Sequence, residues 1–267
     1  MGRQTVAEAE VVGLDPGVRA CLFDLDGVVT RTATIHAKAW KKTFDTFLRG
    51  FDVHSLRRDE PFDEHADYER YLDGRTRADG IRAFLGSRGI EVPDGDSDDL
   101  PGAETAHGIG AAQQWAFFSL LELCGPKVDQ NSLRYVRAAR EAGLACAVVS
   151  SAGDACAVLD AAGIADLFEA TVDGKVATAL GLLGKPAPDV FLAAAHGLEV
   201  EPADAAVFEG SLAGVDAARA GGFGTIVGVD RIGEGHSDLL RVHGATVLVE
   251  NLSELLNPAR RRPGLEG

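Results

Sequence analysis

Short apolar segments alternate with stretches of helical period along much of the chain. Each apolar segment is rich in Val or Ala and is bounded by Gly, Asp or Ser, as a short buried strand would be. Five segments of this kind predict strands at residues 20–23, 145–149, 205–208, 225–229 and 246–249. Between the later ones, apolar side chains recur at helical spacing, as in Leu133, Val136 and Ala139. Buried strands that alternate with helices indicate an α/β fold with a parallel sheet covered on both faces.

The interval of residues 31–128 has a different pattern. No clear buried strand occurs in it, and its apolar side chains form helical stripes, which comprise Trp40, Phe44, Phe47 and Leu48, then Ile81, Phe84 and Leu85, then Phe117, Leu120 and Leu121. This pattern predicts a helical cap domain inserted after the first strand. We expect a Rossmann-like core formed by residues 1–30 and 129–267, with the cap at 31–128. A length of 267 residues suits one core domain with a sizeable insertion.

The charge balance excludes several classes of partner. The chain has 41 Asp and Glu residues against 26 Lys and Arg residues, a formal charge of -15. Such a surface repels nucleic acid and anionic lipid. No apolar run reaches the roughly 18 residues that span a bilayer, and the first ten residues lack the apolar stretch of a signal peptide. The four cysteines form no C-x-x-C pair, which favours a reduced protein without structural zinc. We expect a cytoplasmic monomer that binds neither nucleic acid nor membranes.

The strongest chemical signal lies at the end of the first predicted strand. Asp24 and Asp26 precede Gly27 in a D-x-D-G pattern. The carboxyl end of a parallel strand is where open α/β sheets bind their ligands. Alternation along the strand leaves both carboxylates on one side, where they repel each other unless a cation intervenes. The alternative interpretation is a turn with helix-capping aspartates.

Three further segments carry polar groups that suit phosphate chemistry. Ser150 and Ser151 follow the second predicted strand, where hydroxyls and backbone N–H groups bind phosphate oxygens, although an N-cap serine is the simpler interpretation. Lys185 lies in a proline-rich turn that restricts the direction of its ammonium, and the alternative there is a solvated lysine. Glu209 directly follows the third predicted strand, where it could also be a helix-start acid.

In this order, the four segments resemble the motifs of the haloacid dehalogenase superfamily of phosphotransferases. The similarity extends over residues 20–249, and the helical insertion after the first motif is similar to the cap of the β-phosphoglucomutase-like group. Two cap segments strengthen it: residues 26–40, which include His36, and residues 72–80, which include Arg77. The resemblance implies a magnesium-dependent phosphotransferase that acts on a small sugar phosphate through an aspartyl-phosphate intermediate.

The resemblance also implies a role for each residue of the motifs. Asp24 would be the nucleophile and Asp26 the general acid and base. Ser150 would contact a phosphoryl oxygen, and Lys185 would neutralise charge. The implied Mg²⁺ ligands are Asp24, the backbone carbonyl of Asp26, and Glu209. The implied substrate-binding residues are His36, Arg77, Ser151 and Gln113.

The chain departs from the family pattern at two positions that bear on function. Gly210 stands where the fourth motif usually carries a second acid that ligates magnesium. Gln113 stands where the group has a substrate-contacting lysine, and a neutral amide supplies hydrogen bonds without charge. Three interpretations stay open: a working enzyme with weakened metal binding, an enzyme with a shifted substrate, and a retired enzyme that acts by binding. The runner-up activity is that of a phosphatase, with water as the phosphoryl acceptor.

Overall fold

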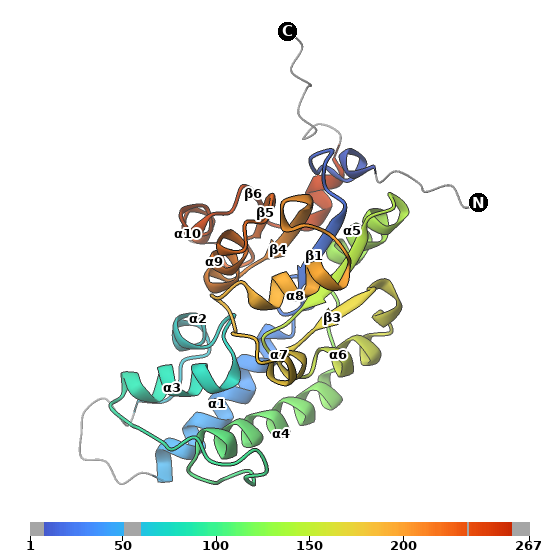
Figure 1. Cartoon of the computed structure of the whole chain (residues 1–267). Helices are drawn as coiled ribbons and strands as arrows, with labels where there is room; N and C mark the ends of the chain where they lie inside the picture. Colours follow the sequence, from blue (N-terminus) through green and yellow to red (C-terminus); the bar gives the residue numbers. More distant parts are fainter. Residues whose placement is uncertain (1–7, 51–59, 234, 258–267) are drawn as a thin grey trace. The chain divides into compact units, whose positions relative to one another are not determined.

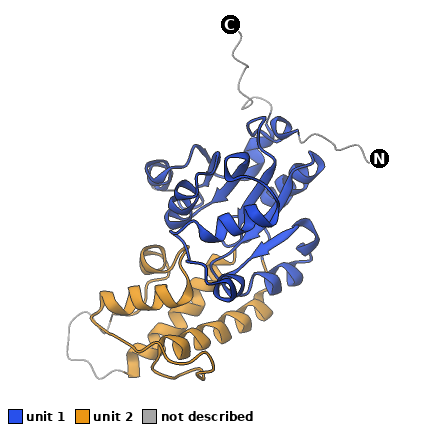
Figure 2. Ribbon diagram, viewed as in Figure 1, with its two compact units in different colours: residues 1–30, 127–267 blue, residues 31–126 orange. Residues whose placement is uncertain are grey.

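The chain is divided into two compact units. The computed structural model describes residues 8–50, 60–233 and 235–257. Unit 1 comprises Met1–Thr30 and Lys127–Gly267, and unit 2 comprises Arg31–Pro126 (Figure 2). Unit 2 is therefore an insertion, because the chain leaves unit 1 after Thr30 and re-enters it at Lys127. Among the helices of the described ranges, none is long and apolar enough to cross a membrane.

Unit 1 is built on a six-stranded parallel sheet of order β3-β2-β1-β4-β5-β6 (Figure 1). The strands are β1 Ala20–Asp24, β2 Ala145–Val149, β3 Ala170–Val172, β4 Ala205–Glu209, β5 Thr225–Val229 and β6 Val247–Val249. The chain order reverses at β1, which pairs with β2 on one side and β4 on the other. The predicted Rossmann-like α/β fold is confirmed, and its reversal point is the usual ligand position of such sheets.

The hydrophobic pattern predicts five of these strands and misses β3. That strand has only three residues, and two of them are partly exposed. A segment this short contains too few positions for an alternating pattern to distinguish it from a loop. The strand pairs with the outer side of β2, so its omission leaves the centre of the sheet as predicted.

Helices cover both faces of the sheet in unit 1. They are α5 Gln130–Glu141, α6 Ala155–Ala162, α7 Gly174–Leu180, α8 Asp189–Gly197, α9 Leu212–Ala220 and α10 His236–His243, with short 3-10 segments at Ala9–Val12, Ala165–Leu167, Pro202–Asp204 and Leu252–Leu256. Successive strand residues face opposite sides, so neighbouring residues of β1 serve different layers. Leu22 packs in the cluster that contains Phe191 of α8. Phe23 stacks on Phe208 at 4.5 Å between ring centroids, and Tyr135 of α5 meets Phe23 edge-on.

Unit 2 is helical in its described residues. Its helices are α1 Ala33–Gly50, α2 Ala66–Tyr71, α3 Arg77–Ser87 and α4 Ala106–Cys124. Aromatic rings form the centre of its core: Phe44 lies 4.9 Å from Trp40, 5.4 Å from Phe62 and 4.2 Å from Phe84 between ring centroids. The first two helical stripes of the sequence, which include Trp40 and Ile81, contribute most of the buried side chains of this core. Burial of this apolar area against water is what holds the inserted unit together.

Replacement of Phe44 tests this core. Phe44→Ala removes a fully buried ring, so we expect the free energy of unfolding to fall by about 3–5 kcal/mol, measured by urea denaturation. Leu123→Ala on α4 is the control, because that side chain is 81% exposed and its loss should cost less than about 0.5 kcal/mol. Similar losses in the two variants would contradict the central place of Phe44.

Candidate active site

The ends of neighbouring strands bring the predicted catalytic residues together in unit 1. Strand β1 ends at Asp24, β4 ends at Glu209, and Ser150 directly follows β2. Lys185 comes from the segment between α7 and α8. All four residues are buried, so each polar group needs a partner to offset its lost hydration.

The ammonium of Lys185 joins two of these strand ends. Its Nζ donates hydrogen bonds to Asp24 Oδ1 at 2.7 Å and to Glu209 Oε1. The lysine side chain is 0% exposed, and its ammonium lies 4.9 Å from the ring centre of Phe191. A buried ammonium without partners would be costly, so the two carboxylates allow Lys185 to be charged in this position.

Glu209 is held on both of its carboxylate oxygens. Besides the Lys185 contact through Oε1, Oε2 accepts hydrogen bonds from Ser211 N at 2.9 Å and from Ser211 Oγ at 3.0 Å. Ser211 Oγ also accepts from Gly214 N and so caps α9. A Cβ at position 214 would lie 1.9 Å from Glu209 Oε1, so only glycine lets the carboxylate approach the start of α9.

The pKa values of Asp24 and Lys185 are shifted by burial and by the charges around them. Burial is the main reason why the pKa of Asp24 is raised well above its usual range. The neighbouring carboxylate of Glu209 raises this pKa further, whereas Lys185 has the opposite effect. Burial alone would lower the pKa of Lys185, but the carboxylates of Asp24 and Glu209 outweigh it and the net direction is upward. Lys185 therefore stays protonated at neutral pH. An additional cation near Asp24 would favour its ionised, nucleophilic form.

Asp26 and Ser150 form a second pair at the same edge of the sheet. Ser150 Oγ donates to Asp26 Oδ2 at 3.1 Å, and Ser150 N donates to Val172 O in β3. Asp26 lies in the turn after β1, where Gly27 has a φ of +96°, a conformation that side-chain-bearing residues rarely adopt. The contact that we predict between Ser150 and a phosphoryl oxygen stays a prediction, and the observed bond shows that Ser150 also orients Asp26.

The predicted magnesium ligands differ in the contacts that they already make with other protein groups. Within the described residues, no group of three His, Cys, Asp or Glu side chains is arranged to hold a metal ion. Glu209 already contacts Lys185 and Ser211, and Gly210 offers no side chain. Magnesium commonly binds one or two protein oxygens together with substrate phosphate and water. The carboxylate of Asp24 and the carbonyl of Asp26 fit such a site, whereas a ligand role for Glu209 stays a prediction.

Three of the predicted substrate-binding residues meet inside unit 2. Arg77 Nε donates to Gln113 Oε1 at 2.7 Å, and Gln113 Nε2 lies 3.4 Å from His36 Nδ1. The amide oxygen faces the arginine, so the amide NH₂ must be the donor to the imidazole. The His36 ring in turn stacks on Phe117, with centroids 4.0 Å apart. Gln113 is 0% exposed, and its side chain connects Arg77 on α3 with His36 on α1.

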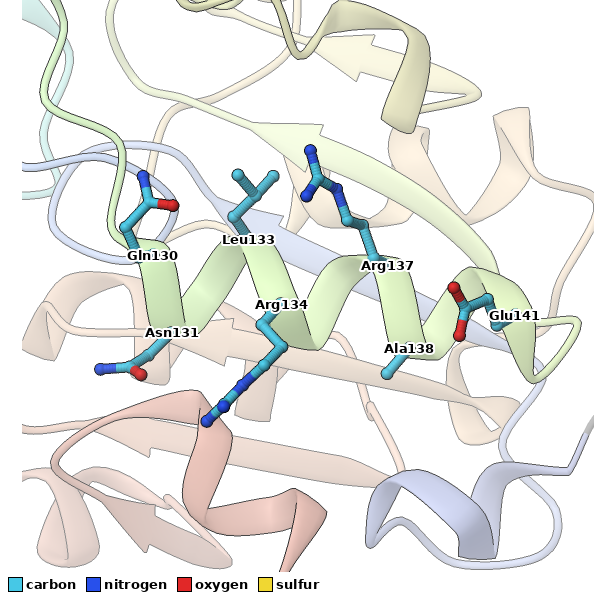
Figure 3. Close-up of a pocket in the computed structure, with 7 residues that line it drawn as sticks. All are labelled: Gln130, Asn131, Leu133, Arg134, Arg137, Ala138 and Glu141. Carbon is cyan, nitrogen blue, oxygen red and sulfur yellow. The ribbon is translucent and has the colours of Figure 1, made fainter.

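The remaining predicted residue, Ser151, is partly exposed in the segment after β2. A pocket elsewhere in unit 1, along α5, is lined by none of the predicted site residues (Figure 3). Its lining residues are Gln130, Asn131, Leu133, Arg134, Arg137, Ala138 and Glu141. The predicted catalytic residues therefore lie outside this pocket.

Two residues of the site were not predicted from the sequence. Ser211 supports Glu209, and Gly214 makes room for it. The signal that could have found them is the spacing of serine and glycine two and five positions after the acid, which suits a helix cap followed by a close approach.

Comparison with known proteins gives a consistent set of relatives. The family model of haloacid dehalogenase-like hydrolases matches residues 18–222. The chain is 47% identical over 249 residues to β-phosphoglucomutase of Mycobacterium tuberculosis (strain CDC 1551 / Oshkosh), which covers 93% of this chain and 95% of that protein. It is 30% identical over 239 residues to β-phosphoglucomutase of Bacillus subtilis (strain 168), covering 89% and 92% respectively. A crystal structure of β-phosphoglucomutase from Clostridium difficile shares the fold, with a TM-score of 0.68 and 23% identity over 89% of this chain and 93% of that one.

A double-mutant cycle tests the buried lysine cluster. Lys185→Met leaves two buried carboxylates without their cation, so we expect it to lower the free energy of unfolding by about 3–5 kcal/mol. Adding Glu209→Gln to this variant removes one of those charges, so the double variant should regain part of the loss in urea denaturation. Lys175→Met, at an exposed lysine of unit 1, is the control and should be nearly neutral. Strictly additive losses would show that Lys185 and Glu209 do not interact.

Proposed function

The chain belongs to the haloacid dehalogenase-like hydrolase family, and we propose that it transfers phosphoryl groups of a small sugar phosphate in the manner of a β-phosphoglucomutase. The observation that carries the proposal is the buried Lys185 ammonium between Asp24 and Glu209, beside the Asp26–Ser150 pair. The 47% identity to a β-phosphoglucomutase over 93% of the chain supports the substrate class.

In the first half-reaction, Asp24 is the nucleophile. A carboxylate oxygen of Asp24 attacks phosphorus, a bond forms between them, and the bond from phosphorus to the substrate oxygen breaks. Lys185 holds Asp24 through Oδ1, which fixes the carboxylate and leaves Oδ2 as the candidate attacking oxygen. The same ammonium is already in place to offset the negative charge that the transferring group brings to the site.

Asp26 moves the proton in both half-reactions. It gives a proton to the departing substrate oxygen, and it later takes one from the hydroxyl or water that attacks the aspartyl phosphate. That second attack returns Asp24 to its carboxylate form. The hydrogen bond from Ser150 to Asp26 Oδ2 holds this carboxylate in place, and we assign the proton transfer to the carboxyl group of Asp26.

Magnesium would be held by the carboxylate of Asp24 and the backbone carbonyl of Asp26. Phosphotransferases of this family generally depend on it, and when bound it neutralises charge on the phosphoryl oxygens. Because Gly210 supplies no carboxylate, we propose that the ion binds weakly to the free protein and more tightly together with a phosphorylated substrate.

The contacts among Arg77, Gln113 and His36 in unit 2 favour an anionic substrate. Arg77 carries a planar guanidinium that suits phosphate oxygens, and Gln113 and His36 fix its Nε side. We propose that Arg77 contacts an anionic part of the sugar phosphate and that Ser151 contributes a hydroxyl at the core. The cytoplasmic location and the monomeric state stay predictions.

A phosphatase is the second candidate, because the matching family is one of hydrolases and water can replace the sugar hydroxyl in the second half-reaction. Both activities use the same residues in the first half-reaction. A purely binding function is less favoured, since Asp24, Asp26, Ser150 and Lys185 are all present and form two hydrogen-bonded pairs.

An assay against a panel of hexose and pentose phosphates tests the proposed activity. Free phosphate and isomerised product are followed together, and we expect isomerised product to exceed free phosphate for at least one sugar. Asp24→Asn should lower turnover by about 10⁴-fold or more, because it removes the nucleophile while keeping the side-chain shape. Asp160→Asn, at an exposed acid of α6, should leave turnover unchanged. Activity near wild type in Asp24→Asn would exclude the mechanism.

Substitution of Gly210 tests the proposed metal dependence. A Cβ at this position would lie 3.3 Å from Val229 O, so a side chain needs only a small adjustment. We expect Gly210→Asp to tighten magnesium binding by about 10–100-fold in calorimetry, with and without inorganic phosphate, because it adds a carboxylate. Gly210→Asn has nearly the same shape without the charge and is the matched control. Equal affinities in the two variants would mean that the metal does not bind beside residue 210.

A further inference from the structure

Arg231 is far from Asp26 in the sequence, and it forms a cluster of hydrogen bonds in unit 1. It follows β5, and its guanidinium nitrogens donate to three groups of unit 1: Nη1 to Asp129 Oδ2 at 2.5 Å, and Nη2 to Val28 O at 3.0 Å and Ser132 Oγ at 3.1 Å. The Arg231 side chain is 19% exposed and that of Asp129 is 2% exposed. We call these four residues the Arg231 cluster.

The base of Arg231 is itself firmly held. Its neighbour Asp230 accepts hydrogen bonds through Oδ1 from the backbone N–H groups of Ile232 and Gly233. Asp230 Oδ2 accepts from Ser237 N and Ser237 Oγ, which connects the segment to α10. Arg231 therefore extends from a fixed segment, so its reach to Val28 is well defined.

The cluster holds the turn that carries Asp26. Within this turn, Thr30 N donates to Leu25 O at 2.9 Å and Gly27 N donates to Thr30 O at 2.8 Å. Val28 O accepts from both Ser132 Oγ and Arg231 Nη2, at 2.7 and 3.0 Å. The carbonyl two residues after Asp26 is thus bonded to α5 and to the segment after β5.

The segment by which the chain leaves unit 1 and the segment by which it returns each contribute one residue to the Arg231 cluster. The chain leaves unit 1 after Thr30, and Thr30 pairs with Val128 just after the chain returns. Asp129 N donates to Val29 O at 3.0 Å, and Asp129 Oδ1 caps α5. Arg231 binds the outgoing segment through Val28 and the returning segment through Asp129, so these contacts within unit 1 hold the Asp26 turn.

We propose that Arg231 is a positioning residue that holds Asp26 in place for proton transfer. The inference rests on the proposed function, because it takes Asp26 as the general acid and base. Small displacements of a catalytic group cost rate steeply, since proton transfer needs the donor within hydrogen-bond reach of the reacting oxygen. Arginine suits the role because its rigid fork binds a carboxylate and a carbonyl at once, which the single ammonium of lysine does less well.

Hydrogen exchange measures the positioning directly. In Arg231→Met, we expect backbone amides of residues 25–30 to exchange about 10- to 100-fold faster than in the wild type. Asp129→Asn keeps a good N-cap for α5 but loses the charge, so it should give a smaller acceleration in the same segment. Arg241→Met, at an exposed arginine of α10 paired with Asp238, should leave this segment unchanged.

Kinetics then separate a positioning role from a general loss of stability. We expect Arg231→Met to lower kcat on a sugar phosphate by about 100-fold with little change in KM. Single-turnover release of 4-nitrophenol from 4-nitrophenyl phosphate should fall far less, because this leaving group needs little protonation. Asp26→Asn should give the same split between substrates, and Arg231→Lys should recover part of the loss.

The outcomes distinguish this proposal from the proposed function. If Arg231→Met does not fold, as judged by circular dichroism, Asp129→Asn and Arg231→Lys replace it in both measurements. Unchanged exchange at residues 25–30, or equal losses on both substrates, would overturn the positioning role. Absence of wild-type activity on every sugar phosphate would overturn the proposed function, and faster exchange in Arg231→Met would then still support the fixed turn.

Discussion

The site depends on one buried cation, the ammonium of Lys185, which joins Asp24 at the end of β1 to Glu209 at the end of β4. These two strands are neighbours where the chain order reverses, so like charges would otherwise face each other across the ligand edge of the sheet. Local features follow from this constraint: a serine at position 211 to satisfy the second oxygen of Glu209, and a glycine at 214 to make room for it. Asp24, Lys185, Glu209 and the start of α9 therefore form one connected group.

Gly210, which supplies no carboxylate, bears on the charge around Asp24 and Lys185. With Glu209 engaged by Lys185 and Ser211, Asp24 is the acid that remains at the end of β1 to attract magnesium, together with the Asp26 carbonyl. Fewer fixed negative charges weaken a divalent ion site but also reduce repulsion toward an incoming phosphate. Under the proposed function, glycine at position 210 would weaken magnesium binding without abolishing phosphoryl transfer, because magnesium commonly takes part of its ligands from substrate phosphate.

Much of the fold could be predicted from the sequence, because strand alternation and helical stripes are local signals. Residues 20–23 and 145–149 were recognisable as buried strands, and the stripe that contains Phe44 marked the inserted helical unit. The three-residue strand β3 carried too little pattern to find. The partners of the site residues were harder to predict, since they are set by tertiary contacts: Arg231 lies 203 positions from Val28, and no local pattern connects them. The links of Gln113 to Arg77 and His36 are of the same kind.

The most direct measurement is to trap the phosphorylated protein. After rapid mixing with a radiolabelled sugar phosphate and quenching in acid, we expect label to stay on the protein, to be released by hydroxylamine as an acyl phosphate would be, and to map to the peptide containing Asp24. The label should be absent from Asp24→Asn. Label on another residue, or product formation with no labelled protein at any quench time, would contradict the central role given to Asp24 and its buried lysine.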